Sequence, residues 1–319
     1  MKRSVFAFVI LSAVMSNIAC SCNKDDVPSV QQSSKPIVFN ITEGGKTRGA
    51  QVTTANLGTF GVFASFVTRD HDVSSARLGD FFYNAACTSN TPTAYYWPTS
   101  GYMYFDIYAP YNGAGITLPA KNSMVSAIYT VTVQENAASQ IDFVTTDIQS
   151  ISSEYKATLE PTLEHRMANV QFDIRNKKST AIKIKTLYFY GLKRTGKLQY
   201  AIWDNLDNTN TASSHPFYLT ANTNVAGNAI ISLTGSDKQF FIIPQTIAAG
   251  TEIFKIVTEE DGVENTYTYS LPSAYTFSMA NVYKFTLNVG KSLTVTSVTV
   301  TDWAMTAAST SLGISNWIE

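Results

Sequence analysis

The segment Val170-Gln171-Phe172-Asp173-Ile174-Arg175 alternates strictly between apolar and polar side chains. Successive side chains of an extended strand point to opposite faces of a sheet, so this alternation indicates a β-strand with one buried and one solvated face. Short runs rich in Val, Ile, Thr, Tyr and Phe, residues that favour strands, recur on both sides of it. The ranges that we interpret as further strands are 37–41, 57–67, 102–108, 128–133, 182–190, 240–243, 253–257, 266–271, 283–289 and 293–300.

Two of these ranges predict more than a strand. In residues 102–108, Met103, Phe105 and Ile107 share one side, which indicates a strand with one apolar face. In residues 293–300 the parity of the apolar positions changes between Val295 and Val298, which predicts a bulge or a bend.

The sequence as a whole predicts an all-β fold made of two β-sandwich domains, with few or no long helices. Gly, Pro and Asn separate the strands at short intervals, and 17 Tyr and 18 Phe suit a strand-rich core. A chain of 319 residues is long for one core and suits two. Residues 150–159 carry the best helical pattern, a weak one, and we divide the domains in this polar stretch, at residues 158 and 159.

The N-terminus predicts export. Lys2 and Arg3 precede an apolar run at residues 5–15, which at about eleven residues is roughly half the length of a spanning helix and therefore indicates a secretory signal. Small residues then lead into Cys20 and Cys22. This arrangement resembles a lipoprotein signal at residues 1–21, in which Cys22 or, alternatively, Cys20 carries the lipid that holds the chain in the outer membrane.

The residues after this cysteine are polar. Lys24, Asp25 and Asp26 look like the surface-export tag of such lipoproteins, and residues 22–36 as a whole read as a flexible tether. An ordinary cleaved signal with incidental cysteines is the alternative.

Catalytic and metal-binding patterns are missing from the sequence. His71, His165 and His215 share no ligand spacing, and a structural role for His165 is the simpler interpretation. Cys87 alone remains in the mature chain, so we expect a buried thiol and no internal disulfide. A formal net charge of −1 without a basic patch argues against nucleic acid as a binding partner. We therefore expect no enzyme activity, no cofactor and no metal.

Two other functions stay open. Tyr95, Tyr96 and Trp97 form an aromatic cluster that a surface glycan-binding lipoprotein would use as a stacking platform, although packing in an aromatic-rich β-protein is the plainer account. A glycoside hydrolase would need two carboxylates across a cleft. The sequence shows no such pair, and Glu259-Glu260-Asp261-Gly262 reads as a solvated hairpin loop.

A series of short motifs follows one another along nearly the whole mature chain. They are Ile37-Val38-Phe39, Thr47-Arg48-Gly49, Leu57-Gly58-Thr59-Phe60-Gly61-Val62-Phe63-Ala64, Tyr96-Trp97-Pro98, Phe105-Asp106-Ile107-Tyr108-Ala109-Pro110, Leu163-Glu164-His165-Arg166-Met167-Ala168-Asn169-Val170-Gln171-Phe172, Ile243-Pro244-Gln245, Asn281-Val282-Tyr283-Lys284-Phe285 and Val300-Thr301-Asp302-Trp303. In this order the motifs resemble the fimbrillin family, the subunits of type V pili, although Ala280-Asn281-Val282-Tyr283 lacks the glycine that the family usually has before this tyrosine.

This resemblance implies transthyretin-like sandwiches at residues 37–158 and 159–319, and a maturation route at the cell surface. An arginine-specific protease would cut between Arg48 and Gly49 and release the strand at residues 37–41. Another pilin subunit would then fill the vacated groove with a strand, and the head-to-tail contact would build a filament.

The C-terminal segment is the expected donor strand. After Trp303, sixteen residues at about 3.3 Å each span roughly 50 Å, enough to cross a neighbouring sandwich. Leu312 and Ile314 have the same parity, and Trp317 would seat at the end of the groove. The alternative is that this segment completes its own C-terminal sandwich.

Overall fold

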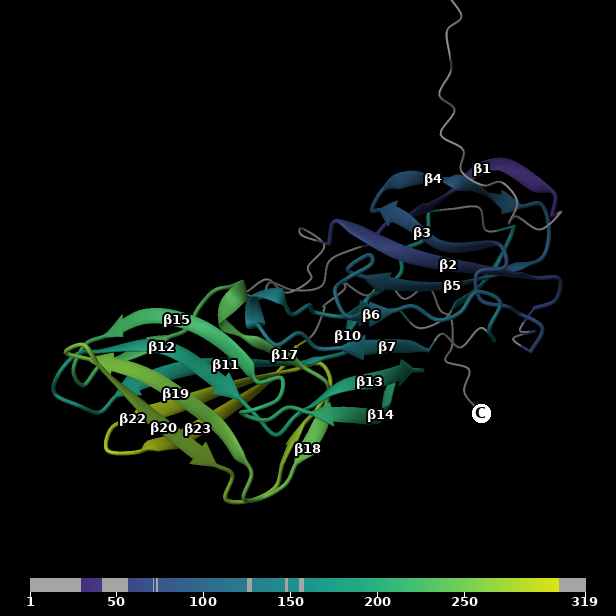
Figure 1. Cartoon of the computed structure of the whole chain (residues 1–319). Helices are drawn as coiled ribbons and strands as arrows, with labels where there is room; N and C mark the ends of the chain where they lie inside the picture. Colours follow the sequence, from purple (N-terminus) through teal and green to yellow (C-terminus); the bar gives the residue numbers. More distant parts are fainter. Residues whose placement is uncertain are drawn as a thin grey trace, which may run out of the picture.

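The computed structural model describes residues 30–41, 57–70, 72, 74–124, 128–146, 149–154 and 158–303. The fold is all-β, as the sequence predicts. In these ranges the helical segments are two short 3-10 turns, η2 (Ala137–Ser139) and η3 (Ser236–Lys238). No helix in the described part of the chain is long and apolar enough to cross a membrane. The molecule is elongated, with two lobes that lie end to end (Figure 1).

The N-terminal lobe packs a sheet against a two-stranded ribbon. Its core gathers Phe60 and Val62 from the sheet and Trp97 from the ribbon. The ribbon pairs β1 (Gln32–Phe39) with β4 (Thr91–Pro98) in antiparallel fashion. The sheet order is β10 (Glu164–His165), β8 (Val144–Thr145), β5 (Tyr102–Ala109), β2 (Thr59–Val67) and β3 (Phe82–Thr88), and β9 (Gln149–Ser152) also pairs with β5.

The C-terminal lobe is a sandwich of two sheets. The stretch quoted first in the sequence analysis lies in β11 (Ala168–Asn176), where Val170, Phe172 and Ile174 are fully buried, as predicted. One sheet runs β16 (Ile230–Ser232), β11, β22 (Asn281–Val289) and β23 (Leu293–Asp302), with β17 (Phe240–Ile242) also on β11. The other runs β15 (Phe217–Val225), β12 (Ile182–Phe189), β19 (Glu252–Glu260) and β20 (Val263–Ser270).

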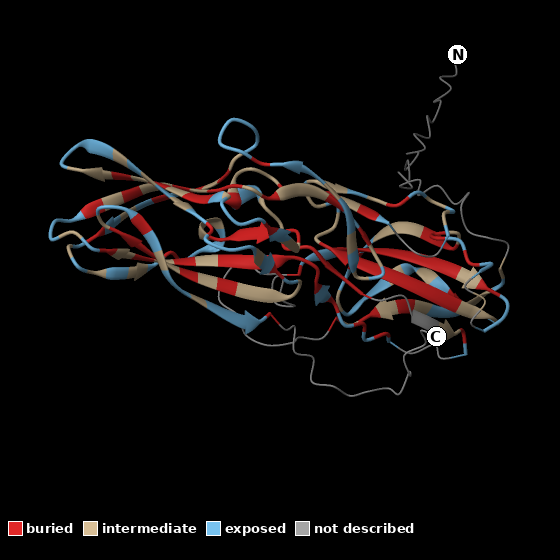
Figure 2. Cartoon of the chain, turned by 90° about the horizontal axis from the view of Figure 1, so that it is seen from below, coloured by how far each residue is buried: buried red, intermediate tan, exposed pale blue. Residues whose placement is uncertain are grey.

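A further sheet joins the two lobes. It runs β14 (Ile202–Thr209), β13 (Lys193–Gln199), β7 (Tyr129–Thr132) and β6 (Ile116–Thr117), and the short ribbon of β18 (Gln245–Ile247) and β21 (Tyr275–Phe277) lies nearby (Figure 1). Phe63 and Tyr129 belong to the same apolar cluster as the C-terminal core, and Figure 2 shows buried segments running from one lobe into the other. The domain division at residues 158 and 159 stays a prediction.

The structure differs from the sequence analysis in three elements. Residues 149–152 form β9 rather than the start of a helix, because they pair with β5. β5 is buried on both faces and not on one, since it lies inside the sheet with a core on each side, Ile107 in one and Tyr108 in the other. β1 begins at Gln32, within the residues 22–36 that we assigned to the tether. The predicted bulge in β23 is confirmed at Thr296, which the register with β22 skips.

Candidate functional site

β1 lies in a slot between two segments of the N-terminal lobe. On one side it pairs with β4, and on the other it runs parallel to the chain at Leu159. The Asn40 N–H donates to the Leu159 carbonyl at 2.6 Å, and the Leu159 N–H donates to the Val38 carbonyl at 2.8 Å. The Asn90 N–H donates to the Phe39 carbonyl at 2.8 Å. The slot therefore satisfies backbone groups on both edges of the strand.

The inner face of β1 is an integral part of the core. Ile37, Phe39 and Ile41 are each at most 3% exposed and project from alternate positions of the extended chain. The Phe39 ring packs edge-on against Phe60 and Phe105, with ring centroids 6.2 and 5.4 Å apart. Removal of β1 would uncover a row of aromatic and aliphatic side chains.

The two halves of β1 are held differently. Gln32 of β1 pairs with Pro98 of β4, and Pro36 pairs with Tyr96, so that four positions of β1 face two of β4. The opposite shift follows: from Pro36–Tyr96 to Val38–Pro92, two positions of β1 face four of β4. Pro36 has no backbone N–H to donate, and Ser34 and Lys35 are exposed. The first half of β1 therefore pairs with β4 at two separated positions, whereas Val38 and Phe39 at its end pair with consecutive residues of β4, beyond a second shift that skips residues 93–95 of β4.

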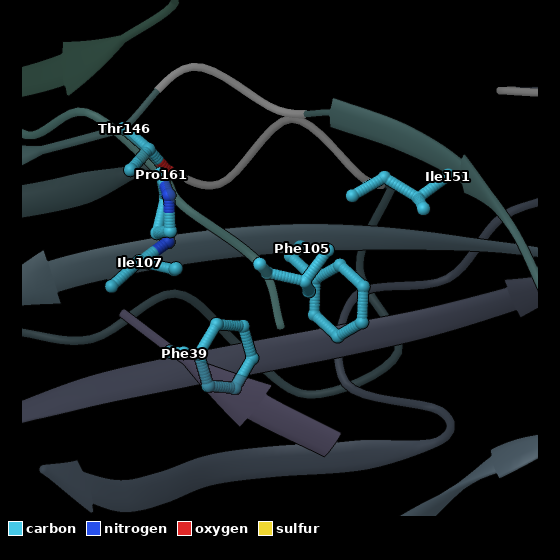
Figure 3. Close-up of a pocket in the computed structure, with 7 residues that line it drawn as sticks. Phe39, Phe105, Ile107, Thr146, Ile151 and Pro161 are labelled. Atoms are coloured by element: carbon cyan, nitrogen blue, oxygen red, sulfur yellow. The ribbon is translucent and has the colours of Figure 1, made fainter. Parts of the chain in front are cut away.

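A small pocket opens beside the Phe39 ring. Figure 3 shows Phe105 near the centre of the view, with Phe39 below it and Ile151 to its right. Leu159, which pairs with β1, and Pro161 also line it, as do Ile107 and Thr146. This pocket lies among residues of the N-terminal core, beside Phe39 at the end of β1.

Trp303, the last described residue, is clamped between two rings. The indole is 1% exposed and stacks on His165, with centroids 3.9 Å apart and planes 15° apart. Phe241 stacks on it as well, at 5.7 Å. The backbone N–H of Trp303 donates to the Ala280 carbonyl at 2.7 Å. The point from which residues 304–319 leave the described body is therefore fixed.

The polar side chains under this clamp are structural. His165 Nδ1 lies 2.9 Å from Asp142 Oδ1, and both side chains are at most 2% exposed. The buried Arg166 donates from Nε to Thr145 Oγ1 at 2.7 Å and from a terminal nitrogen to Glu164 at 2.8 Å. The structural role that the sequence analysis gives His165 agrees with this burial, whereas Asp142, its partner 23 residues away, carries no sequence signal.

The aromatic run at the end of β4 does not form a stacking platform. Trp97 is fully buried, and Tyr95 stacks on Phe82 at 4.2 Å. Tyr96, 40% exposed, points to the other face of the strand. The plainer packing interpretation of these three residues fits the structure.

The structure also places Cys87, the turn at Asp261 and Gly262, and His215. Burial raises the pKa of the Cys87 thiol to about 12, so this cysteine is a core residue, as predicted. Asp261 and Gly262 make the two-residue hairpin turn between β19 and β20. His215 is exposed and contacts Glu135 at 2.6 Å. Among the described residues no group of three or more His, Cys, Asp or Glu side chains is placed to hold a metal ion.

The residues predicted for maturation and donation lie outside the described residues, as does His71. These are Cys20, Cys22, Arg48, Gly49, Leu312, Ile314 and Trp317.

A family model described as fimbrillin-like matches residues 47–303. The chain belongs to the fimbrillin-like family. A fimbrial protein from Bacteroides vulgatus has a similar fold, with a TM-score of 0.61 and 20% sequence identity over 85% of this chain and 100% of that one. A candidate cell adhesion protein from Bacteroides ovatus gives a TM-score of 0.53 and 15% identity over 86% and 100%. No curated protein matches the chain significantly.

Two fimbrillin motifs that are distant in the sequence meet at the Trp303 clamp. One supplies His165 and Arg166, and the other, which ends the family match, supplies Trp303 itself. A third supplies Asp106, which accepts a hydrogen bond of 2.8 Å from the buried Tyr129 hydroxyl. In this fimbrillin-like chain these motifs serve the packing of the junction between the lobes.

Proposed function

We propose that the chain is a structural subunit of a cell-surface fimbria, polymerised by strand exchange and supporting adhesion. The observation that carries the proposal is the position of β1. This strand precedes the predicted cleavage site at Arg48, and yet its inner face completes the N-terminal core. A segment that is buried here but lies on the far side of a cleavage site is suited to be replaced by another strand.

The energetics favour replacement over an empty slot. At roughly 1.5–3 kcal/mol for each buried large apolar side chain, Ile37, Phe39 and Ile41 together contribute about 5–9 kcal/mol. An empty slot would lose this term and leave the edge of β4 unpaired. A strand from a second subunit would restore both by β-augmentation. The same contact repeated head to tail does not close and therefore extends a filament.

The precursor reaches the surface as a lipoprotein in this proposal. Cys22, or alternatively Cys20, carries the lipid in the outer membrane, and an arginine-specific protease cuts between Arg48 and Gly49. Mass spectrometry of the precursor should find an acylated cysteine at its N-terminus. A mature chain that begins at an unmodified serine or asparagine would contradict this step.

The donor is the segment after Trp303. Leu312 and Ile314 would enter one face of the slot of the next subunit, and Trp317 would seat at its end. The clamp at Trp303 supports this assignment, because it fixes the root from which the segment reaches its neighbour.

Substitution of the cleavage site tests the maturation step. In cells, Arg48→Ala should leave lipid-anchored monomers and no filaments, whereas Lys46→Ala, a charge lost two residues away, should assemble normally. Normal filaments from the Arg48→Ala chain would refute cleavage at this bond.

Truncation tests the donor. A chain without residues 312–319 should fold and be cut but fail to polymerise. A chain that no longer folds would show that the segment completes its own sandwich, and unchanged filaments would exclude it as the donor.

A further inference from the structure

We infer that cleavage after Arg48 does not by itself empty the slot: the cut N-terminal fragment stays bound through β1 as a noncovalent plug until an incoming strand displaces it. This inference rests on the proposed function, because it concerns the same slot and the same cleavage. It adds that the subunit remains tied to the membrane after proteolysis, through a fragment that carries the lipid at Cys22.

The contacts that hold β1 all lie before the cleavage site. The three buried side chains end at Ile41, and the Ile41 N–H donates to Ser89 Oγ at 3.0 Å. The backbone bonds of Val38, Phe39 and Asn40 to Leu159 and Asn90 also precede Arg48. A cut at residue 48 breaks none of these contacts. It changes only the linkage, from an intramolecular contact with a high effective concentration to a bimolecular one.

The burial of β1 makes its spontaneous loss slow. Departure of the strand would expose Ile37 and Phe39, both at most 1% exposed, and the rings of Phe60 and Phe105 that pack on them. It would also strip partners from backbone groups on both walls of the slot. Differences in affinity between related complexes lie mostly in the rate of dissociation, so a well-buried strand of this kind leaves slowly.

The uneven pairing of β1 gives an incoming strand a place to begin. In the irregular half, Ser33, Ser34 and Lys35 bulge out of register, so that β1 pairs with β4 only at Pro98 and Tyr96 there. A strand in regular register can pair with β4 there while Ile37 and Phe39 still fill the core. It then advances toward Phe39 as β1 withdraws. The apolar slot is covered throughout, which protects the cut subunit from nonspecific association.

Strand exchange, and not proteolysis, then frees the subunit from the membrane. A cut subunit that has no neighbour stays anchored, and each polymerisation event releases one lipidated fragment. Growth of the filament and detachment from the lipid are one step.

A retention experiment tests the plug directly. The full chain is produced without lipid, with a tag at its N-terminus and with the recognition sequence of a specific protease at residues 42–48. It is cut in vitro and passed over a gel-filtration column. The tagged fragment should elute with the body in a 1:1 ratio. Separation of the wild-type fragment from the body immediately after the cut overturns the inference.

Matched variants assign the retention to β1. Phe39→Ala should speed dissociation by a factor of about a hundred to a few thousand, the change expected for loss of a buried phenyl group. Ile37→Val, a milder change that keeps the uncut chain folded, should speed it about threefold to tenfold. Lys35→Ala, exposed on the same strand, should leave the rate unchanged. Equal rates for all four chains would also overturn the inference.

Displacement is read by adding a synthetic peptide of residues 304–319 to the cut wild-type chain. Release of the tagged fragment by this peptide, and not by a scrambled one, supports the exchange step. Detection of residues 30–41 in equal amount with the body inside assembled filaments overturns it. The retention test stays independent of the maturation proposal, because its cut is made in vitro: an uncut Arg48 in cells would refute that proposal and leave the plug intact.

Discussion

Replacement of Trp303 should destabilise the chain more than any exposed substitution. The indole is 1% exposed and lies between the rings of His165 and Phe241. Truncation of a buried tryptophan to alanine costs about 3–5 kcal/mol, a range that includes the aromatic contacts of the side chain, and two stacked rings place Trp303 at its upper end. We therefore expect Trp303→Ala to lower the free energy of unfolding by about 5 kcal/mol. Trp303→Phe, which keeps a ring in the stack, should lose less than half as much.

Urea denaturation followed by circular dichroism measures this loss, with the slope of the transition checked for each variant. A double-mutant cycle with His165→Ala isolates the stack, for which we expect a coupling of about 1 kcal/mol. A loss below about 1 kcal/mol for Trp303→Ala, the range of surface substitutions, would refute the clamp. So would equal losses for the alanine and phenylalanine variants.

Three further predictions concern the core. Because burial raises the pKa of the Cys87 thiol to about 12, this thiol should not react with a thiol reagent at pH 8 in the native chain and should react fully in urea. A fast reaction in the native chain would contradict its burial. Tyr129→Phe removes the hydroxyl that donates to the buried Asp106 and should lower the free energy of unfolding by about 1–3 kcal/mol, as measured by chemical denaturation. Tyr200→Phe, at an exposed position, should leave it unchanged. Gly61→Ala would place a Cβ 2.0 Å from the Tyr108 ring and should lower the free energy of unfolding by about 3 kcal/mol, as measured by thermal unfolding. Gly250→Ala is the control, because its Cβ would meet no atom within 4 Å. Its smaller loss of stability would reflect only the positive φ of 79°.

The elements that could be predicted from the sequence are those with a local pattern. Six residues of β11 alternate between apolar and polar side chains, so its buried face can be predicted without knowledge of the strands it pairs with. The bulge at Thr296 was visible because the parity of the valines changes on either side of it. The family resemblance rested on short motifs in order, and the match over residues 47–303 confirms it.

The elements that could not be predicted depend on long-range pairing or on unusual turns. β13 and β14 are joined at Tyr200 and Ala201, which adopt positive φ of 48° and 58° without the glycine or asparagine that marks such a turn. The double burial of β5 follows from its neighbours and not from its own sequence. Leu159, which walls the slot, is 120 residues from β1, and no spacing rule reveals that contact.

In the proposed strand exchange, β1 can be replaced without unfolding of the subunit, because β1 lies outside the main sheets of the fold. β1 pairs with β4 and bridges at one point to Leu159, while the main sheet of the N-terminal lobe, with β5 and β2 at its centre, contains no residue of β1. The second apolar cluster, which fills the C-terminal lobe and reaches Phe63 and Tyr129 across the junction, also contains none. Local opening in proteins follows such units, so the free energy needed to detach β1 is that of its own contacts and not that of the whole chain. The slot thus combines walls that belong to other segments of the fold with a strand held by its own contacts, the combination that the proposed strand exchange requires.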